Sequence, residues 1–150
     1  MSRIALLIAT LGPVGYWPWG PGTLASAVVA IVWWRAPVAS GVWLVAVALS
    51  VFVGVVAAGR AERFLGPDDG RIVIDELAGM GLAVLAVPHT FVGVLVALLL
   101  FRALDIGKPP PVQQVQAVAG GWGVMLDDLV AGVGAAALAL AGRGLLGSYL

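Results

Sequence analysis

Four long apolar stretches, separated by shorter segments that hold most of the charge, constrain this chain more than any other feature. Only 11% of its residues are charged, whereas a soluble domain usually carries about 25%. This pattern predicts an all-α, small polytopic membrane protein in which residues 1–150 form a single membrane-embedded domain. The stretches are Thr23–Trp34, Val42–Gly59, Leu77–Phe101 and Leu129–Leu146.

The lengths of these stretches differ in what they predict. The second and fourth have the length of a simple membrane-spanning helix, roughly 18 to 20 residues. The first can cross when it is extended from Trp19 to Pro37, with tryptophans as interfacial anchors. The apolar segment from Ile4 to Leu11 resembles the start of a signal peptide but lacks a cleavage site, so we expect a short, retained membrane-associated helix.

The third stretch is too long for an untilted span and is interrupted by Pro88, His89 and Thr90, which are poor residues for a helix interior. We therefore expect a re-entrant or hairpin pair of short helices. Such a pair brings the acids before the stretch and the charges after it to one side of the membrane. The distribution of basic residues favours this arrangement and a cytoplasmic location for that side. The residues concerned are Arg60, Arg63, Arg71, Arg102 and Lys108, against Arg35 on the opposite loop.

Several function classes are excluded by composition. The chain has eight basic and eight acidic residues and no cysteine. It lacks the positive charge of a nucleic-acid-binding protein, so we expect no nucleic-acid partner. Without cysteine there are no disulfides, thiolate ligands or cysteine nucleophiles. The single histidine, His89, lies at the expected turn of the hairpin, and we assign it no catalytic role.

Two acidic pairs, Asp75-Glu76 and Asp127-Asp128, each come directly before an apolar segment and are expected at helix N-termini. Carboxylates there complement the helix dipole and cap free N–H groups, contributing about 0.3 to 1 kcal/mol each, which requires no further function. Four acids entering membrane helices would, however, repel one another unless a cation neutralised them. A hard divalent cation with oxygen ligands fits best. Adjacent helical residues point about 100° apart, so the members of a pair cannot be equivalent ligands.

Arg102, Asp105 and Lys108 recur every three residues before Pro109 and can form one slanting stripe on a helix end. A local ion-paired helix end at the membrane interface explains this stripe without any function. Beside the acidic pairs, Arg102 and Lys108 become candidates for binding a phosphate group.

Glycine-rich segments offer backbone that a ligand could approach. The loop Gly12–Thr23 leads into a helix, and its free N–H groups and Thr23 could receive an anion; an interfacial aromatic anchor loop is an equally simple explanation. Gly120-Gly121-Trp122-Gly123 could do the same, or be only a turn into a helix. Further glycines in the apolar stretches allow close helix packing. They are Gly54, Gly59, Gly79, Gly81, Gly132 and Gly134.

Four motifs in order carry a family resemblance. They are Gly20-Pro21-Gly22-Thr23 with Ser26, then Ile72–Glu76 with Gly79, then Phe101-Arg102 with Asp105, Lys108, Pro109 and Pro111, and then Gly120-Gly121 with Gly123–Asp128 and Ala131-Gly132. From about Leu11 to Gly132 the chain resembles the phosphatidylglycerophosphatase A family. Ala25, where the family commonly has glycine, and the aromatic residues 16–19 depart from the pattern and bear on lipid contacts more than on the chemistry.

The resemblance implies a multi-pass enzyme of the bacterial cytoplasmic (inner) membrane with its active site facing the cytoplasm. Such an enzyme removes the terminal phosphate from phosphatidylglycerophosphate, giving phosphatidylglycerol, and depends on Mg²⁺. Its partners would be this substrate and the surrounding membrane lipids; the oligomeric state, a homo-oligomer included, is left open.

Our mechanistic hypothesis assigns these residues to two functions. Mg²⁺ would be held by Asp75 or Glu76 together with residues of the pair Asp127-Asp128, and would orient water for in-line attack on phosphorus. Asp105 would be a further ligand or a general base. Attack by water is preferred over an aspartyl-phosphate route, because the usual Asp-x-Asp-x-Thr signature is absent. The substrate phosphate would be bound by Arg102, Lys108, Gly22 and Thr23.

One alternative comes from another functional class. Acids within a membrane and helices broken by glycine also mark transport pathways, so a small ion or proton transporter could use the same acidic residues. The acids fall near helix ends, which favours a surface site. A purely structural membrane subunit would leave the clustered acids unexplained. Mg²⁺ and Mn²⁺ both prefer oxygen ligands and are not distinguished. Glu62, Asp68 and Asp69 are left unassigned.

Overall fold

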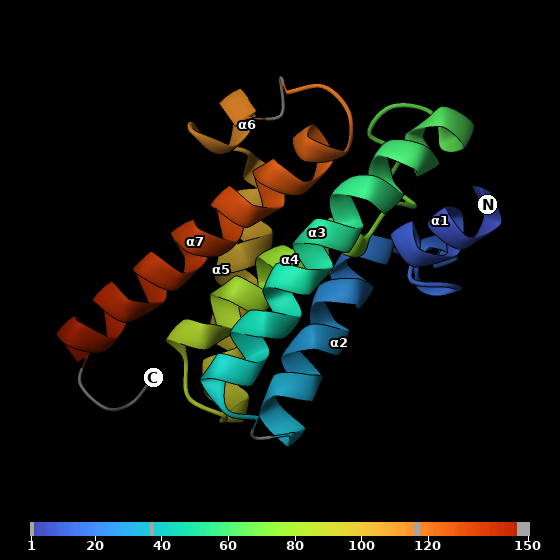
Figure 1. The fold of residues 1–150 in the computed structure, drawn as a ribbon. Helices are drawn as coiled ribbons and strands as arrows, with labels where there is room; N and C mark the ends of the chain where they lie inside the picture. The colour runs from blue at the N-terminus through green and yellow to red at the C-terminus, as the bar shows by residue number, and fades with distance from the viewer. Residues whose placement is uncertain (1, 37, 116–117, 147–150) are drawn as a thin grey trace.

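The computed structural model describes residues 2–36, 38–115 and 118–146, and within these ranges all regular structure is helical (Figure 1). This agrees with the expected all-α class. The α-helices are α1 (Ser2–Ala9), α2 (Pro21–Arg35), α3 (Ser40–Leu65), α4 (Ile74–Ala83), α5 (Phe91–Gly107), α6 (Val112–Val115) and α7 (Gly121–Leu146). Two short 3-10 helices, η1 (Val14–Tyr16) and η2 (Val84–Ala86), precede α2 and follow α4.

Helix α4 lies at the centre of the bundle. It packs most extensively against α7 and also contacts α2, α3 and α5, while α1 packs on α3 (Figure 1). The residues of α4 suit this position because small and apolar side chains occupy most of its surface: Ala78, Gly79, Met80, Gly81 and Ala83 are all buried. Phe101 is the largest of the fully buried side chains and belongs to the same apolar cluster as Met80.

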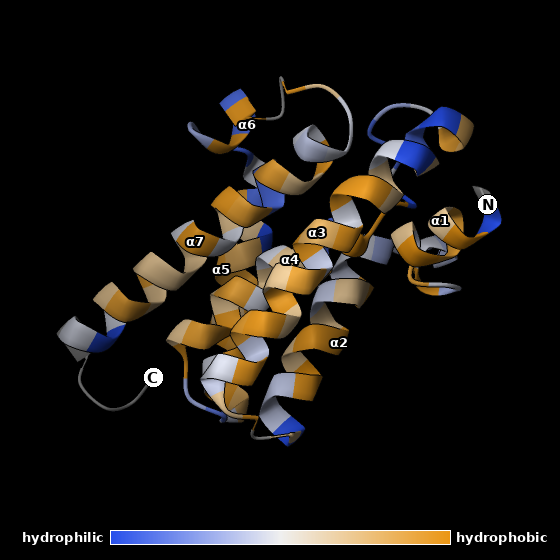
Figure 2. Cartoon of the chain, viewed as in Figure 1, coloured by the Kyte–Doolittle hydropathy of each residue, from blue (hydrophilic) through white to orange (hydrophobic). Residues whose placement is uncertain are grey.

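Among the described residues, two helices are long and apolar enough to cross a membrane. They are α3 and the part Gly121–Gly144 of α7, in which an 18-residue segment has a mean hydropathy of 2.5 and 1.8, respectively. These correspond to the second and fourth apolar stretches, which the sequence predicted to have a simple span length. Figure 2 shows that apolar residues cover the middle of the bundle, whereas hydrophilic residues gather toward its ends.

Within the stretch from Trp19 to Pro37, which was expected to cross, the structure has the shorter helix α2. Gly20, in a left-handed conformation with a φ of 83°, precedes the first helical residue, Pro21, and the helix ends at Arg35. Its 15 residues extend about 22 Å, less than the roughly 30 Å of a bilayer's hydrocarbon core. Pro37 lies outside the described residues.

Large apolar side chains face outward on the long helix α3. Val45, Leu49 and Phe52 are 59%, 60% and 74% exposed. Monomeric soluble proteins rarely expose contiguous apolar surface of this kind, whereas lipid tails accept it. This face therefore supports a membrane environment for α3.

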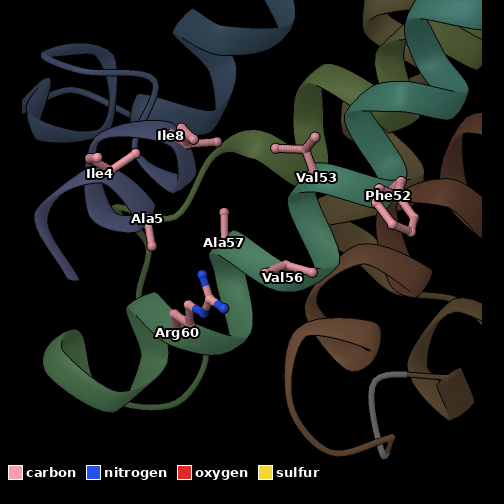
Figure 3. A pocket seen from close by; sticks show the side chains of 8 residues that line it. All are labelled: Ile4, Ala5, Ile8, Phe52, Val53, Val56, Ala57 and Arg60. Carbon is pink, nitrogen blue, oxygen red and sulfur yellow. The ribbon is translucent and has the colours of Figure 1, made fainter. Parts of the chain in front are cut away.

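A groove of about 330 Å³ lies between α1 and α3, as Figure 3 shows. Ile4 and Ile8 of α1 face Val53 and Ala57 of α3 across it, and the guanidinium of Arg60 stands at one end (Figure 3). The other lining residues, Ala5, Phe52 and Val56, are apolar as well. The groove is thus a surface suited to apolar groups, with one charge at its edge.

The third apolar stretch forms two helices, as expected. Helix α4 runs into η2, the chain turns at Val87–Thr90, and α5 begins at Phe91. The Oγ1 atom of Thr90 accepts a hydrogen bond from the Gly93 N–H at 3.1 Å, which caps α5. The His89 ring stacks on Trp33 at 4.0 Å, and its Nδ1 atom lies 2.5 Å from the Trp33 carbonyl oxygen. This histidine therefore packs at the turn, between the two helices and α2.

The second acidic pair does not lie at a helix N-terminus, and the prediction on this point is wrong. Helix α7 already begins at Gly121, so that Asp127 and Asp128 fall in its second turn. The chain turns one residue earlier, at Gly120, whose φ of 73° few other residues adopt. Gly121 is helical and packs so closely on the carbonyl of Val55 in α3 that a side chain would overlap it. The glycine-rich segment thus serves helix packing.

Candidate active site

The two acidic pairs meet because α4 and α7 approach each other through glycine. A Cβ atom on Gly79 would overlap the carbonyl oxygen of Asp128 and lie 2.7 Å from the Phe101 ring. One on Gly132 would overlap the carbonyl oxygen of Gly79. Since neither glycine has a side chain, the second turn of α7 lies directly beside the first turn of α4, where Asp75 and Glu76 are.

Five carboxylates form two groups that share one member. Oxygen atoms of Asp75, Asp127 and Asp128 all lie within 4.8 Å of one another, and so do oxygens of Glu76, Asp105 and Asp128. We call these the first and the second carboxylate group. Asp75 and Glu76 fall in different groups, in keeping with the expectation that neighbouring helical residues are not equivalent ligands. Asp127 and Asp128, by contrast, both belong to the first group.

Several oxygens of these groups are buried without a hydrogen-bond donor in the described part of the chain. They are Asp75 Oδ1, Glu76 Oε2 and Asp128 Oδ2. A buried carboxylate without a partner is costly, because it has lost its water and gained nothing in return. Carboxylate oxygens are also the ligands that Mg²⁺ prefers. The donor set therefore fits a hard divalent cation.

Arg102 connects α5 to the second carboxylate group. Its Nη1 atom donates to Asp105 Oδ2 at 2.5 Å and lies 3.7 Å from Glu76 Oε1. The Arg102 side chain is 17% exposed. Its Nε atom is buried and has no acceptor among the described residues. The ion pair between Arg102 and Asp105 along the helix is the one that the alternative of an ion-paired helix end describes.

Lys108 leaves the expected stripe and contacts α7. Helix α5 ends at Gly107, and Lys108 has a left-handed backbone with a φ of 40°. Its Nζ atom consequently donates to Asp127 Oδ2 at 3.0 Å. Burial by itself lowers the pKa of Lys108, but the hydrogen bond and the charge of Asp127 outweigh it and raise the pKa above 10.5. Lys108 is therefore protonated at neutral pH.

Gly22 and Thr23 were both predicted to bind phosphate, but the structure brings only Gly22 close to the carboxylates. A Cβ atom on Gly22 would overlap Glu76 Oε1 and lie 3.3 Å from Arg102 Nη1. The first turn of α2 thus approaches Glu76, which its dipole stabilises. Thr23 is exposed and does not line the cavity at the carboxylates. The Ser26 hydroxyl donates to the carbonyl of Gly22 at 2.8 Å and is buried with it.

A cavity of about 270 Å³ opens at these residues. Its walls bring together all five carboxylates, Arg102 and Lys108, and we call it the polar cavity. The remaining lining residues are Asp68, Asp69, Gly70, Ile72, Ile106 and Val124.

Asp68 and Asp69 belong to this cavity although the sequence left them unassigned. Both lie in the loop between α3 and α4, which has no periodic pattern from which their direction could be read. Asp69 forms a salt bridge with Arg71, in which Oδ2 of Asp69 lies 2.7 Å from Nη2 of Arg71. The hydrogen bond from Arg71 lowers the pKa of Asp69 below 3.8.

A known protein family and several known proteins are similar to this chain. The family model for "Phosphatidylglycerophosphatase A" matches residues 7–143. A protein of Escherichia coli K12 named "Phosphatidylglycerophosphatase A" is 33% identical over 137 residues, covering 89% of this chain and 80% of that protein. A protein of the same name from Haemophilus influenzae is 32% identical over 95 residues.

A further relative has a different name. A Bacteroides thetaiotaomicron protein named "Putative phosphatidylinositol-3-phosphatase" is 37% identical over 141 residues, covering 88% of this chain and 89% of that protein. No solved structure matches this chain. All five carboxylates and both basic residues of the polar cavity lie within the matched range. The chain therefore belongs to the phosphatidylglycerophosphatase A family of lipid phosphomonoesterases.

Proposed function

We propose that this protein removes the terminal phosphate of phosphatidylglycerophosphate, giving phosphatidylglycerol and phosphate, with Mg²⁺ as its cofactor. The family model and the relatives from Escherichia coli and Haemophilus influenzae support the substrate. The observation that carries the proposal is the polar cavity itself, in which five carboxylates from three helices meet two basic side chains. A phosphate monoester and a divalent cation need such a combination of charges.

The size of the polar cavity fits a headgroup better than a whole lipid. Its volume of about 270 Å³ lies below the roughly 300–1,000 Å³ of pockets that enclose drug-sized ligands. The acyl chains would stay against the apolar outer faces of the bundle. The lipid then needs no transfer into water.

Asp75, Glu76, Asp127 and Asp128 would hold Mg²⁺, since three of them carry buried oxygens that have no donor within the described ranges. Bound there, Mg²⁺ supplies positive charge to the phosphoryl oxygens and makes water more acidic. The two basic residues would bind the remaining phosphoryl oxygens. The Nε–H of Arg102 has no acceptor in the described part of the chain, and Lys108 has three N–H donors, of which Asp127 accepts from one.

Asp105 would hold Arg102 in place through its bond to Nη1. In the reaction, the oxygen of water forms a bond to phosphorus while the bond from phosphorus to the glycerol oxygen breaks. A site carboxylate would accept a proton from the water and return a proton to the glycerol oxygen, which leaves as a hydroxyl. Little else is required, because phosphoryl transfer depends mainly on positioning and electrostatic stabilisation.

We also propose that the end of the bundle with the polar cavity faces the cytoplasm. Arg60 and Arg63 lie in the last turns of α3, just before the loop that lines the cavity, and Lys108 lines it directly. The opposite end has Arg35 at the end of α2 and Arg143 near the end of α7. The excess of basic residues at the cavity end follows the positive-inside tendency.

A second candidate substrate is phosphatidylinositol 3-phosphate, which the name of the Bacteroides thetaiotaomicron relative favours. Both lipids present a phosphate monoester on a polar headgroup. The inositol ring is bulkier than glycerol, so the two substrates make different demands on the mouth of the cavity.

The test is phosphate release from each lipid in detergent micelles, with Mg²⁺, with Mn²⁺ or with EDTA. The native protein should hydrolyse phosphatidylglycerophosphate faster than phosphatidylinositol 3-phosphate, and only with a divalent cation. Asp75→Asn and Asp127→Asn should each lose on the order of 100-fold in rate, because cation stabilisation of the reacting phosphate is worth several kcal/mol.

Glu62→Gln is the matched control, because it removes a charge outside the polar cavity and keeps the oxygen that accepts the Asp68 N–H. It should retain the native rate. Faster hydrolysis of the inositol lipid would favour the second substrate. If the folded native protein hydrolysed neither lipid with either cation, the phosphatase proposal would fail, and ion flux in proteoliposomes would become the next measurement.

A further inference from the structure

The shared position of Asp128 distinguishes this site from a simple pocket for one cation. Asp128 belongs to the first carboxylate group with Asp75 and Asp127, and to the second with Glu76 and Asp105. Each group offers three carboxylate oxygens within 4.8 Å of one another. A carboxylate has two oxygens, so one residue can serve two neighbouring cations.

Orphaned oxygens occur in both groups. Asp75 Oδ1 belongs to a residue of the first group only, and Glu76 Oε2 to a residue of the second group only. Asp128 Oδ2 has no donor among the residues that the structure describes either, and Asp128 is only 2% exposed. A single cation in the first group would leave the buried Glu76 oxygen unsatisfied. A single cation in the second group would leave the buried Asp75 oxygen unsatisfied.

The charges of the polar cavity lead to the same result. Arg102 and Lys108 neutralise two of the five carboxylates by direct contact, with Asp105 and Asp127. Three negative charges, on Asp75, Glu76 and Asp128, then remain. One divalent cation would leave a negative site that repels a phosphate dianion. Two would cancel the negative charge, with Asp68 of the cavity wall also counted, and so remove this repulsion.

We propose that the polar cavity takes two divalent cations, one at each carboxylate group, with Asp128 as the ligand that both share. The inference rests on the cation-dependent function proposed above and adds to it the number of ions and their division between residues. Pairs of metal ions about 3.5–4 Å apart are a recurring arrangement in enzymes that cleave phosphate esters. Asp75 and Glu76, adjacent in sequence, would belong to different ions.

The experiment uses the full-length protein in detergent and Mn²⁺ as the probe. Equilibrium dialysis with elemental analysis gives the number of ions bound, and electron paramagnetic resonance shows whether two ions are close enough to couple. The native protein should bind two Mn²⁺ per chain with a spin-coupled spectrum. Glu62→Gln, outside the cavity, should behave in the same way.

The variants separate the two groups. Asp75→Asn and Glu76→Gln should each bind one Mn²⁺ with an uncoupled spectrum, since each loses a ligand of one group. Asp128→Asn should lower the affinity for both Mn²⁺ ions at least tenfold and abolish the spin coupling between them. Thermal unfolding checks that each variant is folded; where one is not, titration of the native protein decides alone.

Saturation of the native protein at one Mn²⁺, without coupling, would overturn the inference. So would a folded Glu76→Gln protein that still binds two coupled ions. Hydrolysis by a protein that binds one ion would leave the phosphatase function standing and remove only the paired centre. If the protein bound two coupled ions but hydrolysed neither lipid, the paired centre would stand and the phosphatase function would fall.

Discussion

The groove between α1 and α3 and the polar cavity have similar volumes, about 330 and 270 Å³, but they differ in how the chain builds them. The groove is formed by two helices whose facing side chains are apolar, with Arg60 alone at its edge (Figure 3). The polar cavity draws charged residues from α4, α5, α7 and the loop before α4. Volume therefore does not identify the site; convergence of charge from distant parts of the chain does.

The two regions also differ in the energetic cost of their composition. An apolar groove at the surface of a membrane helix is compatible with lipid and needs no compensation. Buried carboxylates are costly without a partner. Their presence in the polar cavity is explained by a ligand, whereas nothing in the groove demands one. Substitutions in the polar cavity should therefore affect activity more than substitutions in the groove.

The largest effect is expected for Arg102→Gln. The substitution removes a charge that contacts Asp105 and lies near Glu76, so it leaves both acids less compensated and removes a phosphate donor. We expect kcat/KM for phosphatidylglycerophosphate to fall on the order of 100-fold, the effect of losing one strong transition-state donor. Arg35→Gln, at the other end of the bundle, is the control. An equal loss of kcat/KM in both variants would show that the cavity end of the bundle has no special role in catalysis.

Gly79→Ala should give the next largest effect. The new methyl group would overlap the Asp128 carbonyl oxygen, which forces α7 away from α4, at a cost of about 1–3 kcal/mol in unfolding free energy. Activity should fall at least tenfold, because the two acidic pairs separate. Gly144→Ala is the control, since nothing lies within 4 Å of a Cβ atom there. Thermal unfolding and phosphate release measure the two effects; an unchanged Gly79→Ala protein would contradict the packing argument.

A small effect on stability is expected for Asp69→Asn at the rim of the polar cavity. Its pKa is lowered by Arg71, so the ion pair stabilises the fold above pH 3.8 and loses this contribution as the pH falls through the lower, folded-state pKa. The variant should melt about 1 °C below the native protein at neutral pH, because exposed ion pairs contribute little. The difference should shrink below pH 3.8 and vanish below the folded-state pKa of Asp69. Melting curves at neutral pH and at a series of acidic pH values decide, and a difference that grew in acid would refute this assignment.

The smallest effect is expected in the groove. Val56→Thr keeps the size of the side chain and adds a hydroxyl to the lining. We expect phosphate release in micelles to change less than about twofold, because the substitution touches none of the charged groups that act on phosphate. A loss comparable with that of Arg102→Gln would show that the groove takes part in catalysis.

Much of the helical pattern could be predicted from the sequence. The apolar stretches correspond to helices, and Pro88 ends one helix pattern before Thr90 caps the next, because both effects act within a few residues. The acids Asp75 and Glu76 fall in the first turn of α4 for the same local reason. Local rules failed at the glycine-rich segment before α7, because glycine is compatible both with a turn and with a helix. Gly120 turns the chain and Gly121 already belongs to α7, which moved Asp127 and Asp128 into the second turn.

The sequence by itself determined which chemistry is present: carboxylates in adjacent pairs, two basic residues after a hairpin, and apolar segments to carry them. Only the tertiary structure decided which of these groups meet. The backbone contact of Gly79 with Gly132 sets the distance between α4 and α7 and so gives Asp128 a place in both carboxylate groups. The left-handed backbone at Lys108 allows its contact with Asp127. Both depend on contacts between residues far apart in the chain, and local sequence patterns carry no information about them.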